Sequence, residues 1–86
     1  DESTWRIFRE GIVFSGNLAK FAQDESLREL LLETGSKTLV EASPHDAVWG
    51  VGLAEADPRV LDRAKWRGTN LLGIILMRVR DCVRTR

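Results

Sequence analysis

The sequence contains few of the residues that build covalent or metal-dependent sites. Only one of its 86 residues is a cysteine, Cys82, and only one is a histidine, His45. A single cysteine excludes an internal disulfide framework and suits a reducing compartment, so we expect a cytoplasmic protein. One histidine without partners forms neither a zinc site nor a Ser-His-Asp or Cys-His arrangement. We therefore expect no metal site and no cofactor.

The sequence also lacks an excess of charge and a long apolar run. Thirteen basic and thirteen acidic residues give a net charge of zero, so no global field attracts nucleic acid or a membrane. The longest apolar run, residues 71–77, is interrupted by Gly73 and is too short to cross a bilayer. No signal peptide is expected, because the chain starts with two acidic residues. A Walker or Rossmann phosphate loop is absent.

What remains is an ordinary globular composition, 43% hydrophobic and 30% charged, which predicts one small domain over residues 1–86. Apolar residues at three- and four-residue steps predict a first helix over residues 4–22, with a break at Gly16 as an option, and a last helix over residues 71–83. The fold class we expect is mainly α: a small helical domain with one or two short β segments.

Local signals predict the elements between those two helices. Asp24 or Ser26 can cap a second helix, and Gly35 is the expected left-handed stop after it. Asp57 followed by proline predicts a short helix over residues 58–65. The run TLVEA, residues 38–42, is the one convincing strand, because its β-branched residues favour a pleated conformation.

The stretch LVEASPHDAVWGVGL, residues 39–53, is chemically dense. Glu41 and Asp46 are the candidate catalytic residues, since two carboxylates beside an aromatic face suit cleavage of a glycosidic bond, in which positive charge develops on the sugar. Trp49 offers a flat face for stacking and Gly50 lets the backbone approach a ligand. Simpler interpretations stay open: Asp46 as a turn cap, Trp49 as a core anchor, and Glu41 at an exposed strand edge.

A second dense stretch, WRGTNLLG, spans residues 66–73. Trp66, Gly68, Asn70 and Gly73 are the candidate substrate-binding residues here. Gly68 permits a tight turn, Asn70 can cap the last helix, and the start of that helix favours an anion such as phosphate. A capped helix after a glycine turn, with no ligand, is the simpler alternative.

These motifs, in this order, resemble the C-terminal half of the NADAR family, also called YbiA-like proteins. The resemblance covers about residues 8–83 and rests mainly on LVEASPxDxxWGxGL and WxGxNxLGxxLMxVR. It implies that Glu41, Asp46, Trp49 and Gly50 match a first active-site motif, and that the four residues of the second stretch match another. Full-length members also carry an aromatic-rich YFSNF-like segment and a Ser-Glu-His motif, which this sequence lacks.

The resemblance implies an N-glycosidase that cleaves the bond of a ribosyl or ADP-ribosyl substrate. Known members act on phosphorylated ribosylaminopyrimidine intermediates of riboflavin synthesis or remove ADP-ribose from guanine bases. The alternative is a non-catalytic module that binds ADP-ribose or another nucleotide, or that serves in assembly. The expected partners are a nucleotide-like small molecule or an ADP-ribosylated base, with a homo-oligomer or a completing chain as further options.

Overall fold

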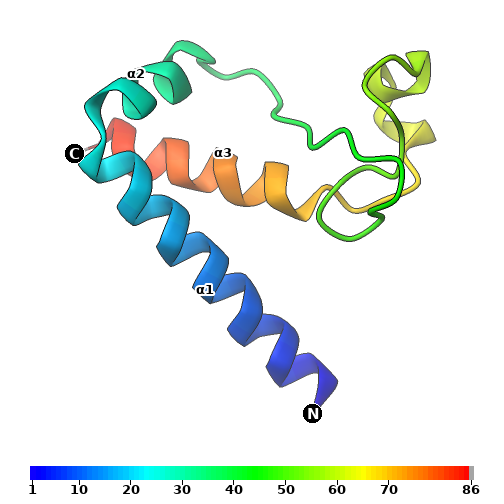
Figure 1. Cartoon of the computed structure of the whole chain (residues 1–86), viewed down its shortest axis with the longest axis horizontal. Coiled ribbons are helices and arrows are strands. Elements are labelled where there is room, and N and C mark those ends of the chain that lie inside the picture. Colours follow the sequence, from blue (N-terminus) through cyan, green and yellow to red (C-terminus); the bar gives the residue numbers. More distant parts are fainter. Residues whose placement is uncertain (86) are drawn as a thin grey trace. The chain divides into compact units, whose positions relative to one another are not determined.

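A computed structural model describes residues 1–85 as helices joined by ordered loops (Figure 1). The helices are α1 (Glu2–Gln23), α2 (Glu25–Glu33) and α3 (Leu71–Arg84), and two 3-10 turns, η1 (Pro58–Leu61) and η2 (Arg63–Lys65), lie in the long connection before α3. The chain forms two compact units. The first unit holds Asp1–Lys37 and the chain from Ile75 onward, and the second unit is Thr38–Ile74. The prediction of a single domain stays a prediction.

Side-chain caps set the limits of α1 and α2. The carboxylate of Asp1 accepts from the Thr4 N–H at 2.9 Å, and α1 then continues through Gly16 without a break. Asp24 ends α1 and begins α2, because its carboxylate accepts from the Leu27 N–H at 3.1 Å. Asp24, and not Ser26, is therefore the cap of α2. Gly35, with φ of 61°, is the left-handed residue expected after α2.

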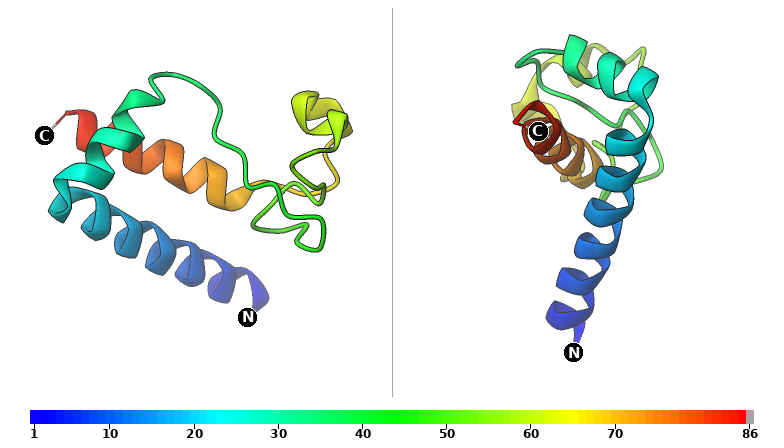
Figure 2. Two further views of the ribbon diagram at one scale, coloured as in Figure 1. Left: turned by 45° about the horizontal axis from the view of Figure 1, so that its top comes forward. Right: turned by 90° about the vertical axis from the view of Figure 1, so that its left-hand side faces the viewer.

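The core of the first unit lies between α2 and the later turns of α3. Leu31, Ile75, Val79 and Val83 are its buried apolar residues. Spacing of four residues places the last three on one face of α3, as the sequence predicted. Figure 2 shows α1 and α2 as two rods joined by a short turn. None of the 22 residues of α1 is buried. The apolar residues of its first half, Trp5, Ile7, Phe8 and Ile12, are exposed, whereas those of its second half are mostly half-buried.

Arg80 ties α3 to the end of α2 within the first unit. It is only 5% exposed, and its Nη1 donates to Thr34 Oγ1 at 2.9 Å and to the Lys37 carbonyl at 2.8 Å. Arg84 is exposed and donates to the Gly35 carbonyl at 2.6 Å. The carbonyl groups after a helix C-terminus carry partial negative charge, so two guanidinium groups are well placed there.

The predicted strand at residues 38–42 is wrong. Among residues 1–85 no strand is present, and the mainly α fold lacks the short β segments that we expected. The segment is extended, but its partners are not a strand. The Glu41 N–H and the Leu39 carbonyl bond to the side chain of Asn70, and the Glu41 carbonyl accepts from Val51 N–H at 2.9 Å.

The predicted helix over residues 58–65 is also wrong in kind. Asp57 caps the segment as expected, and Pro58 takes the first position. Asp62, with φ of −120° and ψ of 104°, then leaves the helical region and caps a second short turn. Two 3-10 turns therefore replace one helix. No helix among the described residues is both long and apolar enough to cross a membrane.

Candidate functional site

The two dense stretches interlock within the second unit. Five consecutive carbonyl groups, those of residues 47–51, accept hydrogen bonds from the backbone of residues 67–72. The pairs are Thr69 N–H to Ala47, Leu71 to Val48, Leu72 to Trp49, Asn70 to Gly50 and Arg67 to Val51, all at 2.9–3.0 Å. We call these two paired segments, residues 47–51 and 67–72, the crossing. The two stretches that the sequence singled out therefore lie side by side.

Gly50 and Gly68 allow backbone segments to pack closely at the crossing. A Cβ on Gly68 would overlap the Gly50 carbonyl oxygen and lie 2.7 Å from the Cα of Ala47. A Cβ on Gly50 would lie 2.8 Å from the Glu41 carbonyl oxygen. Carbon and oxygen atoms cannot approach so closely without displacement, so both positions require glycine. The close approach predicted for a ligand at Gly50 is taken by the protein's own backbone.

Asn70 joins the crossing to the extended segment before it. It is 1% exposed and has φ of 54°, a left-handed conformation that asparagine tolerates better than most residues. Its Oδ1 accepts from the Glu41 N–H at 2.9 Å, and its Nδ2 donates to the Leu39 carbonyl at 2.9 Å. The carboxamide thus supplies the donor and the acceptor that a neighbouring strand would supply.

Gly73 leaves the room that this carboxamide needs. A Cβ at position 73 would overlap the Leu39 carbonyl oxygen and the Asn70 amide group. Gly73 is therefore required for close packing of α3 against Leu39 and the Asn70 side chain. This packing within the second unit explains why the motif has a glycine at this position.

The main chain of Glu41 is hydrogen-bonded on both sides. Its N–H and its carbonyl each have a partner, Asn70 on one side and Val51 on the other. These bonds use only main-chain atoms of Glu41, which is half-buried. The two bonds fix the main chain at Glu41, and the carboxylate oxygens are not used in either of them.

Asp46 shapes the turn that carries the indole of Trp49. Its Oδ1 accepts from the N–H of Trp49 at 2.8 Å and from that of Val48 at 3.0 Å. These bonds stabilise the charged form, first through Trp49 and then through Val48, and hold the pKa of the Asp46 carboxyl below its ordinary value of 3.8. Asp46 is therefore ionised at neutral pH. Its Oδ2 accepts neither of these two bonds.

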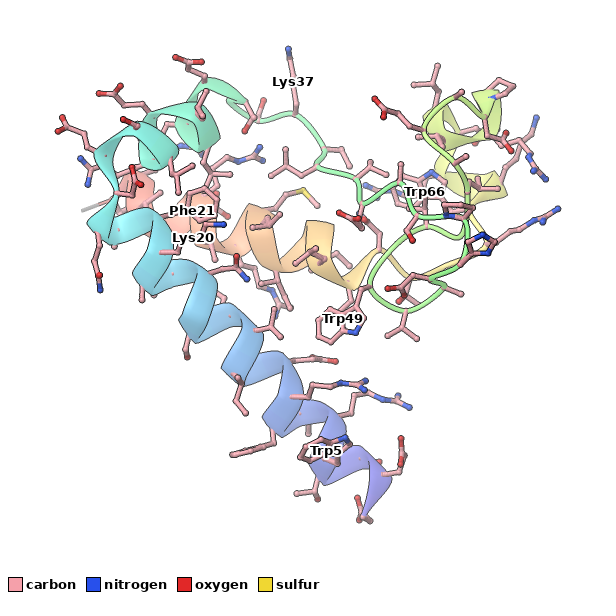
Figure 3. All side chains as sticks on the ribbon, in the orientation of Figure 1. Trp5, Lys20, Phe21, Lys37, Trp49 and Trp66 are labelled. Carbon is pink, nitrogen blue, oxygen red and sulfur yellow. The ribbon has the colours of Figure 1, made fainter. Side chains whose placement is uncertain are left out.

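The two predicted aromatic residues lie in different parts of the second unit (Figure 3). Trp49 is half-buried, and its carbonyl bonds the Leu72 N–H at the start of α3. Trp66 donates from Nε1 to the Val60 carbonyl at 2.8 Å. The sequence placed both in one set of binding residues, but their local surroundings are separate.

Trp66 lines a hollow of its own, of about 230 Å³. The other residues of this hollow are Thr38, Val40, Val60, Leu61 and Arg63. Side chains alternate along an extended chain, so Thr38 and Val40 face away from the side that Leu39 and Glu41 face. The hollow therefore lies across the extended segment from Glu41. Arg63, 5.5 Å from the centre of the Trp66 ring, was not predicted, although its three-residue spacing from Trp66 is readable in the sequence.

An ion pair that sequence reasoning missed lies at the start of η1. Arg59 Nη2 and Asp57 Oδ2 are 2.6 Å apart, and Arg59 Nε also donates to Asp57. The side-chain bond from Arg59, followed by the Arg59 backbone N–H, lowers the pKa of Asp57 to about 2. Asp57 was predicted only as a helix cap, because the sequence does not show that Arg59 turns back onto it.

The start of α3 has few donors left for an anion. The backbone N–H groups of Asn70, Leu71 and Leu72 all bond carbonyl groups of the crossing. A phosphate at this helix start would need the same groups. Among residues 1–85, no three Asp, Glu, His or Cys side chains gather closely enough to hold a metal ion.

These features define a small helical protein whose two loop motifs interlock and carry two acids and an indole. The family model of the NADAR domain matches residues 1–84. The chain belongs to the NADAR domain family. This confirms the resemblance inferred from the two motifs.

The chain is similar to several curated proteins over most of its own length. It is 47% identical over 77 residues to N-glycosidase R617 of Acanthamoeba polyphaga mimivirus, covering 90% of this chain and 45% of that protein. It is 43% identical over 82 residues to protein irg-1 of Caenorhabditis elegans, covering 95% and 39%. It is 35% identical over 77 residues to N-glycosidase YbiA of Escherichia coli, covering 90% and 41%. The chain thus spans less than half the length of these relatives. No solved structure matches it.

Proposed function

We propose that this chain carries the acid-bearing part of an N-glycosidase that acts on a ribosyl or ADP-ribosyl substrate. The observation that supports this most directly is the geometry around the crossing. The main chain of Glu41 is bonded on both sides, and Asp46 is kept ionised next to Trp49. Three relatives that are named N-glycosidases, from a mimivirus, Nostoc punctiforme and Escherichia coli, support the same reaction class.

The two acids are suited to different tasks in such a reaction. Breaking an N-glycosidic bond leaves positive charge on the sugar ring, which water then attacks. Asp46, with its lowered pKa, serves as a fixed negative charge and not as a proton donor at neutral pH. Glu41 is the candidate for activating the attacking water. Trp49 is the candidate for stacking on the base or shaping its pocket.

The substrate class rests on the family resemblance. We propose a nucleotide-like molecule, either an ADP-ribosylated guanine base or a phosphorylated ribosylaminopyrimidine. We propose a cytoplasmic location, with which the free, half-buried thiol of Cys82 is compatible.

The test is to incubate the chain with each substrate and to follow release of the free base by chromatography. Glu41→Gln and Asp46→Asn should each lower the rate, by about 100-fold or more for a group acting at the reacting atoms. Leu30→Ala, at a side chain on α2 that is 60% exposed, is the control and should leave the rate unchanged. A folded chain that releases neither product, or variants at both acids that turn over normally, would overturn the proposal.

A second candidate function, an assembly or nucleotide-binding module, is favoured by the exposed face of α1. Trp5, Ile7, Phe8 and Ile12 are between 54% and 72% exposed, and Ile7, Phe8, Gly11, Ile12 and Ser15 line an apolar hollow of about 520 Å³. Exposed apolar faces of this kind are typical of contact surfaces. A completing chain or a second copy would cover it.

Two measurements separate the candidates. Calorimetry with ADP-ribose should show binding in both cases, whereas release of base occurs only for the enzyme. The solution mass, measured by light scattering, reports whether the chain is a monomer. A monomer that binds no ADP-ribose would exclude the module.

A further inference from the structure

We propose that Asn70 is a positioning residue for Glu41, and that it acts on the reaction through Glu41 without contacting the substrate. The sequence motif alone suggested a substrate ligand at this position. This inference rests on the proposed function, because it takes Glu41 as the acid that works at the reacting atoms.

The geometry leaves the Asn70 side chain little capacity for a ligand. It is 1% exposed, and both of its polar atoms are bonded to main-chain atoms on either side of Val40. A carboxamide has two N–H donors and two acceptor lone pairs, but in a side chain that is only 1% exposed the remaining ones are closed to a substrate. A substrate group could reach them only by displacing the extended segment that they hold.

Asparagine is the one residue type that meets all the demands at this position. The site needs a donor for the Leu39 carbonyl and an acceptor for the Glu41 N–H, at 2.9 Å each. Aspartate lacks the donor, leucine lacks both, and glutamine is one methylene longer. The residue must also adopt φ of 54°, which asparagine tolerates more readily than most residues.

The same residue couples Glu41 to the crossing. The Asn70 N–H bonds the Gly50 carbonyl, and the Asn70 carbonyl accepts from Ile74 N–H in the first turn of α3. One residue therefore joins α3, the Trp49 segment and the Glu41 segment. The Val51 N–H closes the other side of Glu41. A shift of the Asn70 carboxamide moves the main chain of Glu41 and leaves Asp46 on its own turn.

The kinetic test compares Asn70→Ala with Asn70→Asp. Each should lower kcat by about 100-fold, because a misplacement of about 1 Å at a reacting group has this effect. KM should change by less than about threefold, because no substrate contact is lost. A substrate ligand would instead show a raised KM with kcat maintained, and that result would overturn the proposal.

Gly73→Ala tests the same link without altering Asn70. The added methyl group would overlap the Leu39 carbonyl and the Asn70 amide, so it should reproduce the fall in kcat. Gly16→Ala is the matched control, because a Cβ at Gly16 meets no atom within 4 Å. Gly73→Ala with normal kcat in a folded protein would overturn the proposal.

A double-mutant cycle separates positioning from a general effect on folding. In a Glu41→Gln background, Asn70→Ala should add less than about a further twofold loss, since the group it positions is already inactive. If the two residues acted independently, their fold-losses in kcat would multiply. A full additional 100-fold loss in the double variant would therefore overturn the proposal.

Hydrogen exchange gives a test that needs no turnover. In Asn70→Asp the Glu41 amide keeps its acceptor, whereas in Asn70→Ala it loses it, and its exchange should accelerate by about tenfold relative to the wild type. The amides of Val79 and Val83 in the first unit should be unchanged. An unaltered Glu41 amide in Asn70→Ala would overturn the positioning role. Faster exchange in a protein whose wild type releases no base would instead count against the proposed function alone.

Discussion

Asp46 combines a structural role, which its hydrogen bonds show, with the chemical role that we propose for it. One oxygen, Oδ1, bonds the N–H groups of Trp49 and Val48 and so shapes the turn that carries the indole. The simpler interpretation of the sequence, a turn cap after Pro44 and His45, describes this part of its role. The same bonds keep the residue charged, and the proposed role of Asp46 beside a sugar cation depends on that charge. Substitution of Asp46 should therefore affect both stability and activity.

Asp46→Asn should make stability less dependent on acid pH. The folded-state pKa of Asp46 is lowered from 3.8 by the Trp49 and Val48 N–H groups. Its stabilising effect is present above the unfolded-state pKa and is lost as the pH falls through the lower folded-state pKa. The wild type should thus melt at a higher temperature than the variant at pH 6, and the two should converge in acid. Thermal unfolding followed by circular dichroism between pH 2 and pH 7 measures this.

Glu55→Gln is the matched control for that series, because Glu55 is an exposed acid in the same unit. It should leave the melting temperature unchanged across the same range. If the difference in melting temperature between the wild type and Asp46→Asn stays constant down to pH 2, the carboxylate charge does not contribute to stability.

At the scale of elements, the glycines of the crossing and those of α1 have opposite environments. A Cβ at Gly68 would overlap backbone atoms, whereas one at Gly16 meets nothing within 4 Å. Gly68→Ala should therefore destabilise the fold by about 2 kcal/mol through overpacking. Gly16→Ala should stabilise α1 by about 1 kcal/mol, because alanine is the better helix former. Urea denaturation of both variants measures the difference, and equal effects would contradict the close approach at Gly68.

Two arginines on α3 form a second matched pair. Arg80 is 5% exposed and bonds Thr34 and Lys37, whereas Arg84 is exposed and bonds Gly35. Arg80→Ala should destabilise the first unit by about 2 kcal/mol, since it removes buried bonds from a charged donor. Arg84→Ala should cost less than about 0.5 kcal/mol. Chemical denaturation checks both, and a larger loss at Arg84 would contradict the structure.

The sequence predicted the helices better than it predicted what lies between them. Capping at Asp24, the stop at Gly35 and the helix from Leu71 depend on neighbouring residues, which are readable locally. The strand at residues 38–42 was wrong because the partner of Leu39 and Glu41 is a side chain about 30 residues away. The 3-10 turns replaced a helix because Asp62 adopts an extended conformation, which local propensity does not show.

The sequence singled out the two stretches that meet at the crossing, but it did not show which atoms their residues contact. The motifs showed that Gly50, Gly68 and Gly73 matter, and the close approach of backbone was expected at Gly50. That the approaching atoms belong to the protein itself depends on long-range pairing, which periodicity does not contain. The roles of Glu41 and Asp46 in the reaction stay predictions.

At the scale of the whole molecule, stability is concentrated away from α1. The buried apolar residues are Leu31, Val51, Leu53, Ile75, Val79 and Val83, and α1 contributes none of its residues to that set. The first half of α1, where Trp5, Ile7, Phe8 and Ile12 are exposed, depends mainly on the helix's own hydrogen bonds and should open easily, and two glycines weaken the helix further.

Hydrogen exchange should show this difference directly. The amides of residues 6–14 should exchange about 100-fold faster than those of residues 79–83, because opening of α1 exposes no core. Mass spectrometry of proteolytic fragments after a deuterium pulse measures it. A binding partner on the apolar face of α1 should slow exchange there and leave residues 79–83 as they were. Uniform protection in the isolated chain would mean that α1 is already covered.

The register of the crossing limits where this protein can change length. Each of the five carbonyl groups of residues 47–51 has its own donor within residues 67–72, so one inserted or deleted residue in either segment would misalign several pairs at once. The connection between them, residues 54–65, carries no such register, and lengthening it adds only a small loop-closure entropy. Natural or engineered insertions should therefore be tolerated there and rejected in the two paired segments.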